Sequence, residues 1–248
     1  AARRPHESRV MPLFDLAVSA QASTISTWIL PILLAITLHE AAHGIIAWSY
    51  GDDTAYKLGR VTLNPLKHVD PVGTIVLPIL LYLSPLPFVF GYAKPVPVAF
   101  HRLRKPRRDM VYVAAAGPLA NFVLALLSAL LLQIAWLIPD AVGEWTRLTL
   151  FNSIVLNLIL AVLNLLPLPP LDGGRIAVGL LPMSLAAPLA RMERYGLILL
   201  IALFFLLPYA GEAIGDNLSF FDLVIRPPVN WMMPFFAWLA GLPEGIQL

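Results

Sequence analysis

The chain alternates between long apolar stretches and short polar segments that contain charge, glycine or proline. A helix needs about 20 apolar residues to cross roughly 30 Å of hydrocarbon. Four stretches reach that length: residues 23–50, 109–138, 147–166 and 191–209. The pattern therefore predicts a polytopic helical membrane protein.

Two weaker apolar stretches do not predict straight spans. Residues 71–92 are interrupted by Pro78, Pro85 and Pro87, and proline breaks or kinks a helix. Residues 227–242 are short and rich in tryptophan, which fits a helix that lies along the outer membrane interface.

The composition supports a membrane protein, and it argues against nucleic-acid binding and against cysteine-based sites. Of 248 residues, 58% are apolar and 13% are charged, whereas soluble domains carry about 25% charge. The net charge of +2 offers no broad basic face, so we expect no nucleic-acid binding. The absence of cysteine excludes disulfides and cysteine-based zinc sites. We expect one integral membrane domain over residues 1–248, with residues 1–10 an extension that precedes a start at Met11.

The distribution of basic residues predicts the orientation. Lysine and arginine gather in three polar segments: 51–70, 93–108 and the residues after Asp172. The other connections carry more acid than base: 139–149 and 211–228. Short cytoplasmic loops hold the excess of basic residues, so the first set should be cytoplasmic. Because residues 71–92 have basic segments on both sides, they are predicted to form a re-entrant, proline-broken segment.

The sequence His39-Glu40-Ala41-Ala42-His43 lies inside the first predicted span. Residues at i and i+4 share one helix face, so His39 and His43 can reach one metal ion, and Glu40 can serve as a general base. The alternative is a polar cluster that helps helices to pack. Such spacing favours the metal site.

Catalytic zinc usually takes three protein ligands, so a third must come from elsewhere. Asp172 follows a run of prolines at the end of the third span, and glycines follow it in turn. An acid on broken helix at membrane depth is costly without a cation. The alternative for Asp172 is a surface Asp-Gly turn. Asp109 and Glu193 lie beside arginines, and salt pairing explains them better.

Three separated motifs resemble the site-2 protease family of intramembrane zinc metalloproteases. They are HEAAH at residues 39–43, AGPLAN at 116–121 and NLLPLPPLDGGR at 164–175. The segments GRVTLNP at 59–65 and GYAKPVPV at 91–98 resemble a compact prokaryotic subgroup without PDZ or CBS domains. The resemblance implies one Zn2+ per chain on His39, His43 and Asp172, Glu40 as general base, and Asn164 near the scissile carbonyl. For Asn164, bonding to a carbonyl freed at the proline break is an equal alternative.

The expected fold is an all-α polytopic membrane protein. Three transmembrane helices would carry the zinc site, joined by additional C-terminal helices, the re-entrant segment and a short β-hairpin. The strand is expected at Val61 to Asn64, where apolar and polar residues alternate, and its edge would pair with an unwound substrate or form a surface hairpin. Residues 94–98 must be extended, and their prolines favour a stiff gate or support.

Three smaller expectations concern polar residues near these motifs. His68 and His101 lie in basic loops and are interpreted as ordinary cytoplasmic-surface histidines. Gly117 and Asn121 form a small and polar pair at i and i+4 that favours helix packing.

The resemblance implies an intramembrane endopeptidase that cuts transmembrane protein or peptide substrates. It would reside in a prokaryotic inner membrane with its catalytic side toward the cytoplasm. The alternatives are a non-proteolytic metal-binding membrane protein or a metal-ion transporter, and a scaffold, against which an intact Glu40 argues. No feature of the sequence sets the substrate or the oligomeric state.

Overall fold

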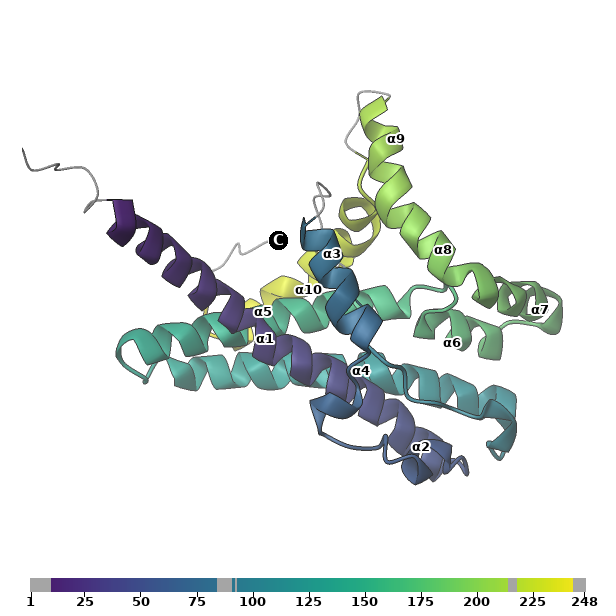
Figure 1. Ribbon diagram of the computed structural model, residues 1–248. Coiled ribbons are helices and arrows are strands. Elements are labelled where there is room, and N and C mark those ends of the chain that lie inside the picture. The colour runs from purple at the N-terminus through teal and green to yellow at the C-terminus, as the bar shows by residue number, and fades with distance from the viewer. Residues whose placement is uncertain (1–9, 84–90, 92, 214–217, 243–248) are drawn as a thin grey trace, which may run out of the picture.

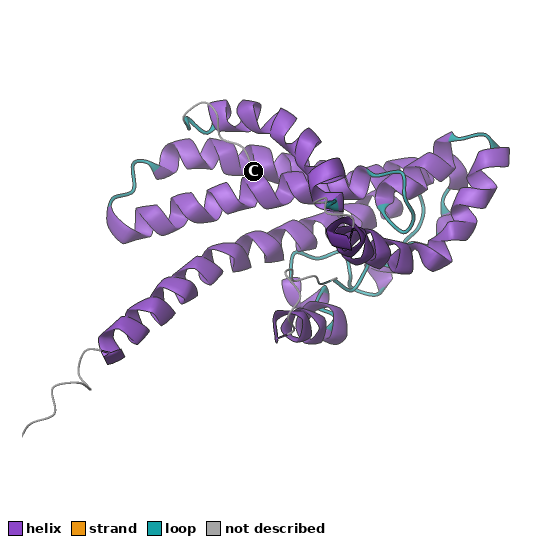
Figure 2. Ribbon diagram, turned by 90° about the horizontal axis from the view of Figure 1, so that it is seen from above, coloured by secondary structure: helices purple, strands orange, loops and turns teal. Residues whose placement is uncertain are grey.

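A computed structural model describes residues 10–83, 91, 93–213 and 218–242. Every regular element in this part of the chain is helical (Figure 2). Three helices are long and apolar enough to cross a membrane: Ile25–Ser49, Pro106–Ala135 and Asp140–Leu165. The first belongs to α1 (Val10–Ser49), and the others are α4 and α5. The predicted all-helical membrane class is confirmed.

Helices α4 and α5 run antiparallel side by side, and α1 crosses against both (Figure 1). Their shared core is apolar: Leu132 of α4 packs with Ile154 and Leu158 of α5, and all three are buried. Close packing of this kind fixes the relative positions of helices that could otherwise slide in lipid. The α4–α5 hairpin is therefore the frame on which α1 is held.

Helix α10 (Arg226–Leu239), preceded by the π-helical turn η6 (Phe221–Ile225), completes this core. Val229 and Met233 are buried against α4 and α5, whereas Trp231 and Trp238 are 82% and 73% exposed. The tryptophan-rich stretch thus has one face in the protein core and one outside it.

The remaining C-terminal elements follow α5 as short helices. They are α6 (Asp172–Leu180), α7 (Met183–Arg191), η4 (Met192–Tyr195), α8 (Gly196–Ile201), η5 (Ala202–Leu206) and α9 (Leu207–Ala213). The fourth predicted span, residues 191–209, is therefore built from successive helical sections, with a π-helical stretch at η5. It is not among the three candidate spans found in the described residues.

The described part of the connection between α1 and α4 contains short helical elements. They are α2 (Thr54–Lys57), η1 (Pro65–Lys67), η2 (Pro71–Val76), α3 (Leu77–Leu83) and η3 (Phe100–Arg102). Residues 71–83 form a helix that begins at a proline, and Asp70 caps it by accepting hydrogen bonds from Val72 N and Gly73 N. The predicted return of this segment lies at residues 84–90 and 92, outside the described residues.

The predicted strand at Val61 to Asn64 is not found; these residues form a bend in a described part that contains no strand. Local side chains satisfy the backbone here. The Thr62 hydroxyl accepts from Asn64 N at 3.2 Å, and Asn64 Oδ1 accepts from Leu66 N at 3.0 Å. Threonine and asparagine compete with ladder hydrogen bonds in this way, and Pro65 then starts a turn. Turn chemistry outweighs the alternation of apolar and polar residues.

Candidate metal centre

Helix α1 carries His39 and His43 one turn apart on the same face. The two rings meet edge to face with their centroids 4.7 Å apart, and their Nε2 atoms are 3.1 Å apart. His43 is 9% exposed, although it lies on a helix with many exposed apolar residues. The predicted i, i+4 arrangement is therefore present and faces the interior of the bundle.

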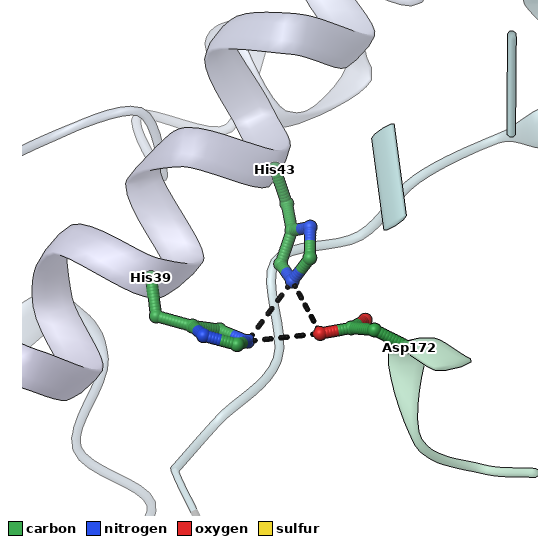
Figure 3. Close-up of side chains that lie close together, drawn as sticks. All are labelled: His39, His43 and Asp172. Atoms are coloured by element: carbon green, nitrogen blue, oxygen red, sulfur yellow. Dashed lines mark hydrogen bonds and ion pairs between the residues drawn. The ribbon is translucent and has the colours of Figure 1, made fainter. Parts of the chain in front are cut away.

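Asp172 reaches both imidazoles from α6 (Figure 3). Its Oδ2 atom lies 3.2 Å from His39 Nε2 and 3.3 Å from His43 Nε2. Helix α5 ends at Leu165, the proline-rich segment 166–171 is not helical, and α6 begins at Asp172 itself. Asp172 is 6% exposed, which excludes the surface turn that was the alternative.

Two glycines allow α6 to begin so close to the proline-rich segment. A Cβ atom on Gly173 would lie 2.2 Å from the carbonyl oxygen of Leu165, and one on Gly174 would lie 2.4 Å from Pro169 N. Any larger residue would push the first turn of α6 away from these backbone atoms. The DGG sequence thus has a steric reason beyond the carboxylate.

The hydrogen bonds of the two histidines orient their rings. His43 Nδ1 lies 2.7 Å from the carbonyl oxygen of Val113, and His39 Nδ1 lies 2.6 Å from Asn121 Oδ1. An oxygen of either kind only accepts, so each Nδ1 donates and each Nε2 directs a lone pair toward the other and toward Asp172.

This arrangement fits a metal ion. Asp172 Oδ2 is buried and has no hydrogen-bond partner in the protein. Two imidazole lone pairs and a carboxylate oxygen would repel one another unless a cation lies among them. Ligand atoms about 2.0–2.1 Å from a tetrahedral zinc ion lie roughly 3.3 Å apart, close to the three separations here. His39, His43 and Asp172 also form the one cluster of three potential metal ligands found in the described part of the chain.

Gly117 of α4 lies directly against the histidines. A Cβ atom there would be 2.4 Å from His43 Nε2 and 2.5 Å from His39 Nε2. The sequence interpretation of Gly117 and Asn121 as helix-packing residues missed that both contact the imidazoles. Their spacing at i and i+4 on one span was the available signal, because it places both on one face of α4.

Glu40 lines the same cavity, which has a volume of about 240 Å³. Its Oε2 accepts a hydrogen bond of 2.6 Å from the backbone N–H of Val96. Asn164 and Arg175 also line the cavity. Asn164 Nδ2 donates one of its two hydrogens to the carbonyl of Leu160 at 3.0 Å, which fixes the amide in the cavity wall.

The extended segment 94–99, called the strap below, closes this cavity. Arg60 is 9% exposed, and its Nη2 donates to the carbonyl of Lys94 at 2.7 Å. At the far end Ala99 N donates to Asp52 Oδ2 at 2.6 Å. Between these anchors Val96 is buried against Glu40. These contacts hold the strap in place and fit the support that was one of the two roles expected for residues 94–98.

His68 also belongs to the support of the strap, and its assignment to the surface is wrong. It is 2% exposed, its carbonyl accepts from Lys94 N at 2.9 Å, and its Nε2 lies 3.1 Å from the carbonyl of Thr62. The basic character of the loop concealed this, because Arg60 and His68 turn inward while Lys67 stays exposed. His101 is exposed as predicted.

The other acids have separate partners. Glu193 forms an ion pair as predicted, but its partner is Arg175, whose Nη2 lies 2.9 Å from Glu193 Oε1, and not an arginine beside it in the chain. Asp109 is 3% exposed and accepts from Lys105 N at 2.7 Å, which makes it a helix cap and not part of an arginine pair.

Comparison with known proteins identifies the same region. Residues 140–207, which include Asn164 and Asp172, match the model of peptidase family M50. The chain is 42% identical over 210 residues to "Putative zinc metalloprotease YwhC" of Bacillus subtilis, covering 80% of this chain and 92% of that relative. It is 34% identical over 173 residues to "Putative zinc metalloprotease Rip2" of Mycolicibacterium smegmatis, covering 69% of this chain and 63% of the relative. The Mycobacterium tuberculosis protein of the same name is 31% identical over 191 residues, with 77% and 71% covered. No solved structure matched.

Proposed function

Because this chain belongs to peptidase family M50, the site-2 protease family, we propose that it is a zinc-dependent endopeptidase that hydrolyses peptide bonds within or near transmembrane segments. The observation that carries the proposal is the convergence of His39, His43 and Asp172 beside Glu40 in one buried cavity. The histidines come from one candidate span, and α5, another span, leads directly into Asp172.

His39, His43 and Asp172 would hold one zinc ion per chain. Zinc, when bound, lowers the pKa of a water molecule to about 7 and polarises a carbonyl group. The three protein ligands leave a position for water and substrate, which distinguishes a catalytic from a closed structural site.

Glu40 is proposed as the general base. Its carboxylate faces the cavity from the residue next to His39, and the Val96 amide holds one of its oxygens. The other oxygen is then the one that takes a proton from the attacking water and returns it to the leaving amine. Val96 thus positions the base without removing its capacity to accept a proton.

Asn164 is proposed to donate a hydrogen bond to the scissile carbonyl as negative charge develops there. Its position in the cavity wall supports this role. Asn164 Nδ2 carries two hydrogens, so the amide can keep its bond to the Leu160 carbonyl and donate its second N–H to the substrate.

The proposed substrate is a transmembrane segment of another protein that has unwound locally. A helix hides its amides in its own hydrogen bonds, so cleavage needs an extended peptide in the cavity. We further propose an inner-membrane location with the basic loops, and therefore the strap, toward the cytoplasm. The cluster of Arg102, Arg104, Lys105, Arg107 and Arg108 supports that orientation.

The test compares wild type with Glu40→Gln in detergent. We expect both proteins to bind one equivalent of zinc by elemental analysis, and the variant to cleave a single-span reporter on the order of 10²–10⁴-fold more slowly. Equal cleavage by the two proteins would refute the mechanism. Zinc flux into proteoliposomes without any cleavage would instead support a transporter.

A further inference from the structure

We propose that Asn121 and Asn157 form an amide relay that fixes which ring nitrogen of His39 faces the metal. The inference rests on the metal site of the proposed function, but it concerns residues outside the cavity. Neither asparagine lines the cavity, so both are positioning residues.

The relay starts at the backbone carbonyl of Ser153, a group that can only accept a hydrogen bond. Asn157 Nδ2 lies 2.8 Å from the carbonyl oxygen of Ser153, which can only accept. The amide NH2 of Asn157 must therefore point toward Ser153, and its Oδ1 must point the other way. That oxygen lies 2.8 Å from Asn121 Nδ2.

The orientation of the Asn157 amide fixes that of Asn121, which in turn contacts His39. Asn121 Nδ2 faces two acceptors, Asn157 Oδ1 at 2.8 Å and the carbonyl of Ala35 at 3.4 Å. Asn121 Oδ1 is consequently directed at His39 Nδ1, at 2.6 Å. Because this oxygen only accepts, the proton sits on Nδ1, and the lone pair of Nε2 faces Asp172 and His43.

Burial makes the orientation of each amide strict. Asn121 and Asn157 are both 0% exposed, at the contact between α4 and α5. A flip of Asn157 would place its Oδ1 against the Ser153 carbonyl, and a flip of Asn121 would place its Oδ1 against Asn157 Oδ1 and the Ala35 carbonyl. Because bulk solvent does not reach either side chain, a flipped amide would leave buried groups unsatisfied.

The two histidines differ in how their orientation is secured. His43 Nδ1 donates directly to the backbone carbonyl of Val113, which no substitution removes. His39 depends on two side chains from two other candidate spans. This asymmetry gives the fully buried pair of asparagines a reason, and it makes the relay open to mutation.

The first test is the tautomer of His39 in the full-length chain in detergent micelles, stripped of metal with a chelator. Ring ¹⁵N NMR shifts distinguish a protonated from an unprotonated nitrogen, and a His39→Gln spectrum assigns the signals. We expect Nδ1–H in wild type and in Asn121→Asp, whose side chain keeps an oxygen at the same place. Asn121→Leu should give a mixture. A neutral wild-type His39 that carries its proton on Nε2 and not on Nδ1 would overturn the relay.

The second test is zinc affinity by competition with a chelator. Asn121→Leu should lose on the order of 10–100-fold, the range for outer-shell partners of metal-bound histidine, and Asn157→Ala should lose less in the same direction. The matched control is Asn152→Ala, which removes a 2.9 Å side-chain bond between α5 and Thr27 of α1 without touching a residue of the relay.

The two tests remain decisive if one variant fails to fold or if the protein is not a protease. Unchanged zinc affinity and unchanged tautomer in a folded Asn121→Leu or Asn157→Ala protein would refute the relay. Neither measurement involves peptide cleavage, so an inactive protein with the expected tautomer and zinc affinities would refute the proposed function alone.

Discussion

The carboxylate of Glu40 accepts a hydrogen bond from the backbone amide of Val96, 2.6 Å away and 56 residues further along the chain. This contact joins the proposed general base on α1 to the strap that closes the cavity. The strap therefore orients one carboxylate oxygen of Glu40, and its residues Pro95, Val96 and Val98 line the cavity.

Substitution of Arg60 should loosen the strap. Arg60→Ala removes the bond to the Lys94 carbonyl, a charge-assisted bond in a buried setting. We expect faster hydrogen exchange at the Val96 amide and cleavage about tenfold slower, because Glu40 is held less firmly. Lys67→Ala, which removes an exposed cation from the same loop, should change neither. Exchange at Val96 that is as slow in Arg60→Ala as in wild type would show that Arg60 is not the anchor.

A methyl group at Gly117 should disrupt the metal centre. The new Cβ in Gly117→Ala would lie 2.4 Å from His43 Nε2, so the imidazoles must move away from the position they share with Asp172. We expect zinc affinity to fall at least about tenfold, while helix content by circular dichroism stays the same, because alanine favours helix over glycine. A variant that binds zinc as tightly as wild type would show that the imidazoles do not need this space.

Loss of the carboxylate charge at residue 172 should weaken zinc binding more than any outer-shell change. Asp172→Asn keeps the size of the side chain but not its charge, so we expect more than the roughly 10–100-fold loss caused by outer-shell substitutions. The matched control is Asp109→Asn on α4, which is also buried but serves as a helix cap. If chelator competition gives equal affinities for the two variants, Asp172 is not a ligand.

The two interpretations of Asn164 predict different results for Asn164→Ala. If its amide stabilises the developing oxyanion, kcat should fall on the order of 10²–10³-fold with zinc binding retained. If it only bonds the Leu160 carbonyl, thermal stability should fall and kcat should not. We expect the first outcome. Asn152→Ala, which removes a 2.9 Å bond to Thr27 elsewhere on α5, controls for the general loss of an asparagine.

Local patterns in the sequence determined the helices, the pairing of His39 with His43 and the break before Asp172. Each follows from interactions within a few residues: helical periodicity places i and i+4 on one face, and prolines cannot continue a helix. The strand at Val61 to Asn64 failed for the same kind of reason, because alternation was weighed without the side-chain bonds of Thr62 and Asn64.

Only the tertiary structure decided what faces these local features. The approach of Asp172 to the imidazoles, the bond from Val96 to Glu40 and the line from Ser153 through Asn157 and Asn121 to His39 all join residues distant in the chain or on different helices. Such contacts depend on how α1, α4 and α5 pack, and packing is set by complementary shape and buried polar groups over many residues at once. The sequence alone identified the candidate metal ligands and the candidate base, whereas the residues that orient them were identified only from the packing of the helices.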